Sequence, residues 1–258
     1  MSPNPSREHP FKRVANELRA EILRGDLAPA GKLPSENELA ERFGVTRSTV
    51  RKGIALLRSE GLVTSHQGKG AFVRERPHVS LRQTGSIYRA RRNAGGKSNF
   101  NAEVEAQGLR PKQIIREVVE TGAPEKVAER LGVEPGAPVV ARRLLFTVDD
   151  GPMHLVDCYY DSAIAAGTRL AEARLIKGGA NAYLEDASGP IGRRIVQFIE
   201  DLDIRMPYPH EAEQLDIPAG VPVARVLRTA YDSAGDALEV MDSIIPCDRH
   251  AFRYVINV

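Results

Sequence analysis

The sequence predicts an α+β protein of two domains: a small helical domain with a β-hairpin, and then a larger antiparallel sheet with helices. Three observations lead to this fold class. The length of 258 residues is comfortable for two domains. Charge is unevenly divided, because residues 1–97 carry 19 basic and 9 acidic side chains whereas residues 98–258 carry 17 and 25. Helical periodicity prevails before residue 61, and a helix–strand–strand pattern occurs twice after residue 128.

Composition excludes several classes of protein. A hydrophobic fraction of 42% is enough to form a core, which argues against a disordered chain. No apolar run approaches the roughly 18–20 residues of a membrane span. The first residues lack the apolar core of a signal peptide, so we expect a cytosolic protein. Cys158 and Cys247 fit no metal-binding spacing and are expected to be reduced structural thiols.

Two helices are predicted at the start of the chain. Apolar residues recur at helical spacing from Phe11 onward, and Gly25 can end this first helix. After a turn, Ser35 or Pro34 opens a second, shorter helix, for which Gly44 is a suitable C-terminal stop. A tight glycine turn then leads into a third helix, which is the pattern of a helix-turn-helix.

The third helix and a following hairpin complete the first domain. Thr46 is a good N-cap, and the helix reaches about Gly61. Residues 62–64 and 71–73 are predicted strands on either side of the flexible segment HQGKG. Three helices with such a wing constitute a winged helix-turn-helix, which we assign to residues 8–76.

The chemistry of the third helix suits DNA. Its N-terminal end is the part that a recognition helix inserts into the major groove. Hydroxyls and free backbone N–H groups there suit phosphates, and an arginine can recognise a guanine edge with about 1–3 kcal/mol of discrimination. On the wing, Gly68 allows the backbone to approach the duplex and Lys69 supplies charge. The residues at the start of the helix are Thr46, Arg47, Ser48, Thr49, Arg51 and Lys52.

A family resemblance strengthens this interpretation. The stretch LPSENELAERFGVTRSTVRKGIALLRSEGLV, followed by GKGAFV, closely resembles the DNA-binding domain of GntR-type bacterial transcriptional regulators over residues 11–74. A second-helix position that is often Arg in that family is Asn37 here, and Asn can still bond to a phosphate or a base. With the resemblance, the candidate DNA-binding residues are Ser35, Asn37, Thr46, Arg47, Ser48, Thr49, Arg51, Gln67, Gly68 and Lys69.

Residues 77–97 form a candidate linker with five basic residues and no acidic ones. Arg89, Arg91 and Arg92 cluster near Tyr88. These arginines can add phosphate contacts beside the wing or close over an effector. The alternative is a solvated connector without a binding role.

An internal repeat organises the second half. Residues 128–156 align with residues 212–240 at a constant offset of 84, with eight identities in 29 positions. Each copy is a short helix, a Gly-Pro turn and two strands, joined by hairpin turns at 149–151 and 233–236. The repeat predicts a duplicated antiparallel sheet with helices packed on it.

The second half also resembles a known domain. Segments such as ERLGVEPGAPVVARRLLFTVDDGP and PCDRHAFRYVI resemble the UTRA effector domain, which defines the HutC branch of GntR regulators, over about residues 98–256. The resemblance implies a chorismate-lyase-like fold, a small metabolite bound between sheet and helices, and a homodimer. The implied effector-site residues are Ser98, Asn99, Phe100, Arg143, Asp157, Asn181, Tyr183 and Glu239.

Two departures from the family pattern bear on the ligand. Arg143 matches the first Arg of an Arg-x-Arg strand, but the second position is Leu145, and Asn181 replaces a common Ser. A phosphate site needs paired cations and hydroxyls, so we expect a less charged or more apolar effector than a phosphosugar. Other interpretations remain open: Arg143 can pair with Asp157 or Glu239, and Glu239 can be an exposed strand residue. Tyr183 can belong in part to the core.

The leading functional hypothesis is a transcriptional regulator, most simply a repressor, that binds an inverted-repeat operator in double-stranded DNA as a homodimer under effector control. An alternative is a ligand-independent autoregulator whose second domain only dimerises. An enzyme is not expected, because the chain has no nucleophile elbow, metal cluster or nucleotide loop, and His154, His210 and His250 are scattered. No cofactor, metal or membrane partner is predicted.

Overall fold

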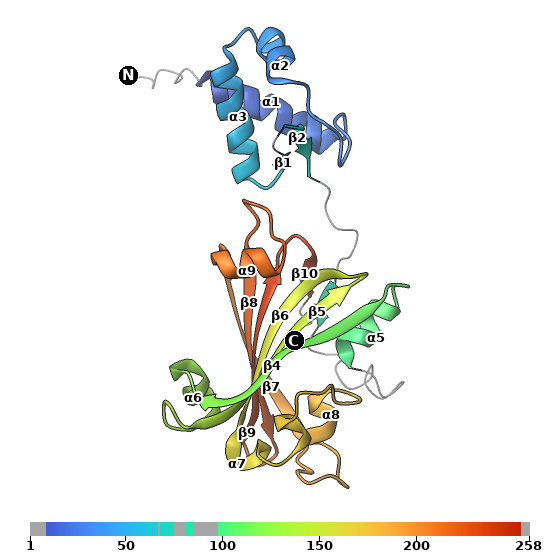
Figure 1. Cartoon of the computed structure of the whole chain (residues 1–258), viewed down its shortest axis with the longest axis vertical. Coiled ribbons are helices and arrows are strands. Elements are labelled where there is room, and N and C mark those ends of the chain that lie inside the picture. Colours follow the sequence, from blue (N-terminus) through green and yellow to red (C-terminus); the bar gives the residue numbers. More distant parts are fainter. Residues whose placement is uncertain (1–8, 67, 75–80, 85–97, 254–258) are drawn as a thin grey trace, which may run out of the picture. The chain divides into compact units, whose positions relative to one another are not determined.

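The computed structural model describes residues 9–66, 68–74, 81–84 and 98–253, and the chain divides into two compact units near residue 78 (Figure 1). The first unit is a winged helix-turn-helix, as predicted. Its elements are α1 (Pro10–Arg24), α2 (Glu36–Phe43), α3 (Arg47–Ser59), β1 (Val63–His66) and β2 (Gly70–Val73).

Local sequence signals fix the starts of α2 and α3. The Ser35 hydroxyl accepts a hydrogen bond from the Glu38 backbone N–H, and the Glu38 carboxylate accepts one from the Ser35 N–H, which together form a capping box. Gly44 ends α2 in the left-handed conformation, with φ of 63°. Thr46 then caps α3. The turn between the two helices is therefore encoded residue by residue.

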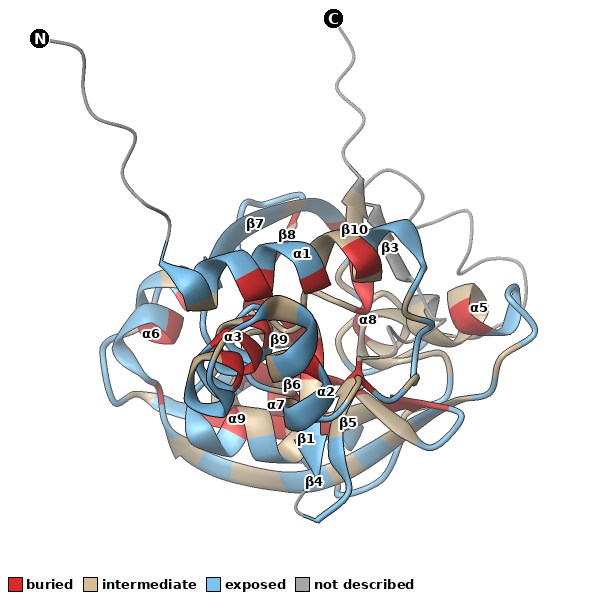
Figure 2. Ribbon diagram, turned by 90° about the horizontal axis from the view of Figure 1, so that it is seen from above, coloured by how far each residue is buried: buried red, intermediate tan, exposed pale blue. Residues whose placement is uncertain are grey.

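The three helices pack on one apolar core. Buried residues are seen along α1 and α3 in Figure 2. Gly53 permits the close approach of these two helices, because a Cβ at this position would lie 3.0 Å from the Phe11 carbonyl oxygen and 3.1 Å from Val14 Cγ1. The core consists of Val14, Ala15, Leu18, Leu33, Leu39, Val50, Ile54, Leu57, Val63 and Val73.

The second unit is built on a six-stranded antiparallel sheet in the order β4-β5-β6-β9-β8-β7. This is the expected α+β fold. No helix in the described part of the chain is long and apolar enough to cross a membrane. The strands are β4 (Pro111–Gly122), β5 (Pro138–Val148), β6 (Gly151–Asp161), β7 (Ile195–Arg205), β8 (Val223–Asp232) and β9 (Ala237–Pro246).

The duplication predicted from the sequence is visible in the order of elements. α6 (Glu125–Leu131) corresponds to α9 (Pro209–Gln214), and the β5–β6 hairpin to the β8–β9 hairpin. The same offset also relates β4 to β7, which the sequence alignment did not reach. The two halves meet where β6 pairs with β9, with Asp157 opposite Asp242.

The two faces of this sheet carry different cores. The α8 face has Val140, Leu144, Cys158 and Tyr160 at its centre and is covered by the short segments α7, η2 and α8. The α6 face has Val139, Ala141, Tyr159 and Val240 at its centre and is covered by α6. The covering segments are α7 (Ser162–Ala165), the 3₁₀ turn η2 (Arg169–Ala171) and α8 (Ala180–Leu184).

A short strand lies within the segment expected to be a basic connector. β3 (Leu81–Thr84) pairs in parallel with β10 (His250–Arg253). α5 (Asn99–Glu105) follows and packs against β4. The linker arginines Arg89, Arg91 and Arg92 lie outside the described residues.

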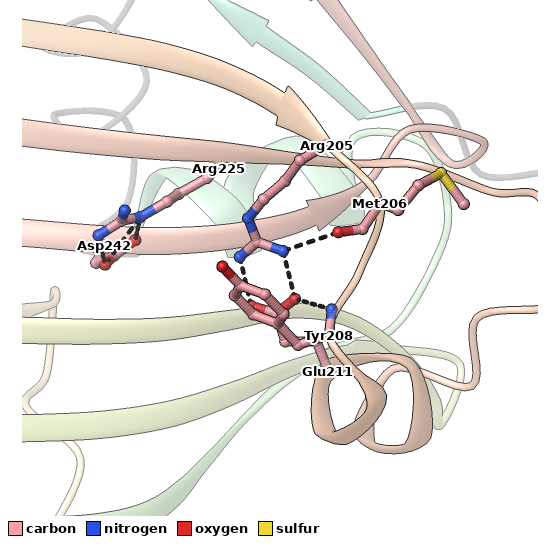
Figure 3. A network of polar contacts seen from close by, with 6 residues as sticks. All are labelled: Arg205, Met206, Tyr208, Glu211, Arg225 and Asp242. Atoms are coloured by element: carbon pink, nitrogen blue, oxygen red, sulfur yellow. Dashed lines mark hydrogen bonds and ion pairs between the residues drawn. The ribbon is translucent and has the colours of Figure 1, made fainter.

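Arg205 fastens α9 to the end of β7 (Figure 3). Its two terminal nitrogens donate to the Glu211 carboxylate at 2.7 Å each, and Nη1 also donates to the Met206 carbonyl oxygen at 3.1 Å. The guanidinium lies over the Tyr208 ring, 4.2 Å from its centroid. Glu211 in turn accepts from the Tyr208 backbone N–H at 2.8 Å. This network holds α9, the helix of the second repeat, at the end of β7.

A buried histidine pair joins β6 to β10. His154 and His250 approach with their Nε2 atoms 2.5 Å apart, and His250 Nδ1 lies 2.9 Å from the Pro246 carbonyl oxygen. That carbonyl can only accept, so His250 carries its proton on Nδ1 and its Nε2 accepts from His154. The His154 ring also packs against Phe100 and Phe146. These two histidines are therefore structural.

Candidate functional site

The N-terminal end of α3 presents two arginines to solvent. The side chains of Arg47 and Arg51 are 62% and 66% exposed. Ser48 and, on α2, Asn37 are also exposed. Charged and polar side chains are therefore exposed at this helix end, which is the part that a recognition helix inserts into the major groove.

Three hydroxyls of the predicted DNA-binding set have partners within the chain. Ser35 caps α2. Thr46 Oγ1 accepts from the Thr49 backbone N–H at 3.2 Å, and the Thr46 and Thr49 hydroxyl oxygens are 2.9 Å apart. These residues fix the helix starts that orient Arg47 and Arg51.

Glu36, which the sequence analysis did not single out, joins the two arginines. Arg51 donates from Nε to Glu36 Oε1 at 3.2 Å and from Nη2 to Oε2 at 2.9 Å, and Arg47 Nη2 lies 3.7 Å from Oε2. The hydrogen bonds from Arg51 hold the pKa of the Glu36 carboxyl below its usual value. An acidic residue in the first turn of a helix is common, so Glu36 carries no specific sequence signal for this contact.

The wing is a short hairpin with a glycine-based turn. Gly68 has φ of 75° and Gly70 has φ of 106°, which are conformations that favour glycine. Lys69 is exposed between them. Lys32 forms an isolated antiparallel β-bridge with Phe72 of β2, so one further backbone segment pairs with the wing. Gln67 lies outside the described residues.

Ser98 and Phe100, from the predicted effector set, lie where α5 begins. Ser98 Oγ accepts from the Asn101 backbone N–H at 3.3 Å and from Gln113 Nε2 at 2.8 Å. A Cβ at Gly179 would lie 3.6 Å from Ser98 Cβ, which places the start of α8 beside this serine. Asn99 is the first residue of α5, and the Phe100 ring packs on Phe146.

Asn181 and Tyr183 both belong to α8 and are half-buried. The Tyr183 hydroxyl accepts a hydrogen bond from the Arg169 backbone N–H at 3.3 Å, and its ring packs against the core of the α8 face. The structure therefore brings these two residues near Ser98, on the same side of the sheet.

Glu239 is buried on the α8 face, with 3% exposure, so the alternative of an exposed strand residue is wrong. It is hydrogen-bonded to Cys158. Its Oε2 atom has no hydrogen-bond partner among the described residues. Burial raises the pKa of this carboxyl, and the positive charge of Arg228 opposes that effect. A buried acid of this kind is a candidate acceptor for a ligand.

Arg143 and Asp157 do not join this group. They lie on the α6 face, where Arg143 pairs with Glu117 and approaches Asp157 at 3.6 Å. The two residues face each other in the β5–β6 register, and successive side chains of a strand point to opposite faces. The ion-pair interpretation thus describes their contact, and the sheet separates them from Tyr183 and Glu239.

The preceding residue, Arg142, occupies the α8 face instead. It is buried, with 3% exposure. Its guanidinium donates to the carbonyl oxygens of Leu170 at 2.7 Å, Glu172 at 2.8 Å and Arg174 at 2.8 Å. The apolar pattern of β5 did not distinguish the two arginines, because Val140 and Leu144 are in phase with Arg142 whereas Val139 and Ala141 are in phase with Arg143.

Two families match the chain. The gntR family of bacterial regulatory proteins matches residues 10–73, and the UTRA domain matches residues 106–251, more than half of the chain. The HTH-type transcriptional repressor NagR of Bacillus subtilis is 26% identical over 96% of this chain and 94% of its own length. The histidine utilization repressor of Pseudomonas aeruginosa is 26% identical over 93% and 88%.

The crystal structure of PhnF from Mycobacterium smegmatis superimposes with a TM-score of 0.56 and 26% identity, covering 95% of this chain and 99% of that one. The match extends over both domains, which agrees with the two sequence families and with the observed fold. The chain therefore belongs to the GntR family of bacterial regulatory proteins, as a HutC-type regulator with a winged helix-turn-helix and a UTRA effector domain.

Proposed function

We propose that this regulator is a cytoplasmic homodimer that represses transcription by inserting the N-terminal end of α3 into the major groove at each half of an inverted-repeat operator. The observation that carries the proposal is the exposure of Arg47 and Arg51 at that helix end. We assign DNA binding to residues 8–76, a basic connection to 77–97, and effector binding and dimerisation to 98–256.

The effector site, in this proposal, is the α8 face near Ser98, Asn181, Tyr183 and Glu239. Two observations favour a ligand with hydrogen-bond donors over a phosphate ester. Arg142 is already engaged by backbone carbonyl groups, and a buried carboxylate oxygen of Glu239 is available as an acceptor. The effector controls DNA binding by favouring one of two states of the dimer.

The DNA-binding assignment predicts that Arg47→Ala and Arg51→Ala each lower affinity for a specific duplex roughly 5- to 150-fold, because each removes a contact worth about 1–3 kcal/mol of base discrimination. The duplex is one selected from a randomised library by the wild-type protein, and binding is measured by gel shift against a scrambled duplex.

Arg58→Ala is the matched control. Arg58 is exposed in the last turn of the same helix. Its replacement by alanine therefore removes the same positive charge, but from the other end of α3. We expect it to weaken selected and scrambled duplexes alike. Undiminished selective binding by both Arg47→Ala and Arg51→Ala would reject α3 as the recognition helix.

A thermal-shift screen of metabolites separates effector control from the ligand-independent alternative. A ligand that binds only the folded protein raises the unfolding midpoint. At a ligand concentration of one hundred times the Kd, the free energy of unfolding increases by about 2.7 kcal/mol. We expect amines and polyols to stabilise the chain more than sugar phosphates, and the stabilising compound to change operator affinity without being consumed. A compound that is stabilising and also turned over would instead indicate an enzyme.

A further inference from the structure

We propose that Glu36 is a positioning residue for sequence recognition: it holds Arg51 in an orientation that leaves one guanidinium edge for a guanine base, and it restrains the attraction of both arginines to phosphates. This inference rests on the proposed role of α3 as the recognition helix. It adds an acidic residue on α2 to a DNA interface that the sequence analysis described only through basic and polar groups.

Arg51 keeps one edge of its guanidinium free of contacts to the described residues. A guanidinium has five N–H donors in a planar fork. Glu36 takes the side edge, formed by Nε and Nη2, at 3.2 Å and 2.9 Å. The end edge, formed by Nη1 and the second N–H of Nη2, makes no hydrogen bond to the described residues that surround it. That edge has two parallel donors, which match the N7 and O6 acceptors of guanine.

The contact with Glu36 also restricts the conformations of the Arg51 side chain. A free arginine loses much of its rotamer entropy when it is fixed on a base. Glu36 is the first residue of α2, and the capping box of Ser35 and Glu38 fixes the backbone on which it stands. The Glu36 side chain is 32% exposed, so water screens it only in part. Arg51 is therefore ordered before DNA arrives, and part of its entropy cost is removed.

Glu36 also lowers the positive charge at the start of α3. Glu36 Oε2 lies 2.9 Å from Arg51 Nη2 and 3.7 Å from Arg47 Nη2, so one carboxylate is shared by two guanidinium groups. The net charge of the three side chains is +1 instead of +2. Non-specific affinity depends on how many phosphates a protein neutralises, whereas base contacts depend on geometry. Glu36 therefore lowers binding to random DNA more than binding to the operator.

The test compares Glu36→Gln with the wild-type protein by selection from a randomised duplex library followed by sequencing, and by titration of selected and random duplexes over a range of salt. We expect tighter binding to random DNA, a salt dependence steeper by about one phosphate equivalent, and a ratio of selected to random affinity that falls about tenfold. The guanine preference at the position read by Arg51 should weaken.

Glu41→Gln is the matched control. Glu41 is exposed on the same helix and is not a partner of either arginine, so this substitution makes the same change in charge. It should raise random binding while it preserves base preference. Glu36→Asp, which retains the charge on a shorter side chain, should restore the salt dependence in full and the base preference in part. Each variant is checked by its thermal unfolding midpoint, which should stay near that of the wild type because an exposed acid in the first turn of a helix contributes little to stability.

The inference is overturned if Glu36→Gln matches Glu41→Gln in base preference while Arg51→Ala loses that preference. If Arg51→Ala retains the preference as well, the recognition role of α3 fails, and this inference fails with it. The two failures are therefore distinguishable in one selection experiment.

Discussion

Replacing Arg142 with Met lowers the free energy of unfolding of the effector domain by about 3–5 kcal/mol. The substitution leaves the buried carbonyl oxygen of Leu170 and the part-buried carbonyl oxygens of Glu172 and Arg174 without their charged donor. Each unsatisfied buried acceptor costs about 1–3 kcal/mol, and the methionine recovers part of the loss by filling the volume. The measurement is urea unfolding of the full chain, followed by far-ultraviolet circular dichroism.

Arg143→Met is a stringent control for this prediction. It makes the same change one residue along β5, on the opposite face, where the side chain is 35% exposed and pairs with Glu117 and Asp157. Partly exposed ion pairs contribute about 0–1 kcal/mol, so this variant should unfold close to the wild type. Equal destabilisation by the two substitutions would contradict the role of Arg142 as the buried donor that holds residues 169–174 in place by hydrogen bonds.

The neighbouring arginines also explain why the grouping of the candidate effector residues on one face of the sheet was only partly predictable. A resemblance in sequence aligned Arg143 with a ligand-binding position, but a shift of one residue moves a strand side chain to the other face of a sheet. Which arginine faces α8 depends on the pairing of β5 with β6, which includes an irregularity between Phe146 and Thr147. The predicted placement of the candidate residues on α5 and α8 depended less on strand register, because each of these helices packs against the sheet as a unit.

The winged helix-turn-helix was predictable for a different reason. Its boundaries depend on local signals, such as the capping box at Ser35, the left-handed Gly44 and the Thr46 cap, and these act within a few residues of sequence. The contact between Glu36 and Arg51 was missed because it joins two helices across 15 positions. Local sequence patterns identify single helices and strands, whereas a contact between two elements can be identified only once the fold is known.

Another contact between residues far apart in the sequence should lower the free energy of unfolding on mild acidification. His154 and His250 lie 96 positions apart and were expected to be scattered, yet they form one buried pair. Burial lowers the pKa of His250 to about 4 and holds the pKa of His154 well below its usual value. Both rings are therefore neutral in the folded protein, whereas the unfolded chain binds protons below about pH 6.5.

The folded state thus has its full stability above pH 6.5 and loses it as the pH falls toward 4. His250 alone should account for a loss of about 2 kcal/mol by pH 5, since each pH unit below the unfolded pKa is worth 1.36 kcal/mol, and His154 adds to the loss in the same direction. Urea unfolding at intervals from pH 7.5 to pH 5 measures this slope, in a range where most carboxylates stay ionised. His250→Gln, which cannot be protonated there, should flatten it, whereas His210→Gln, at an exposed position, should leave it unchanged. A slope that His250→Gln does not alter would assign the acid sensitivity to other groups.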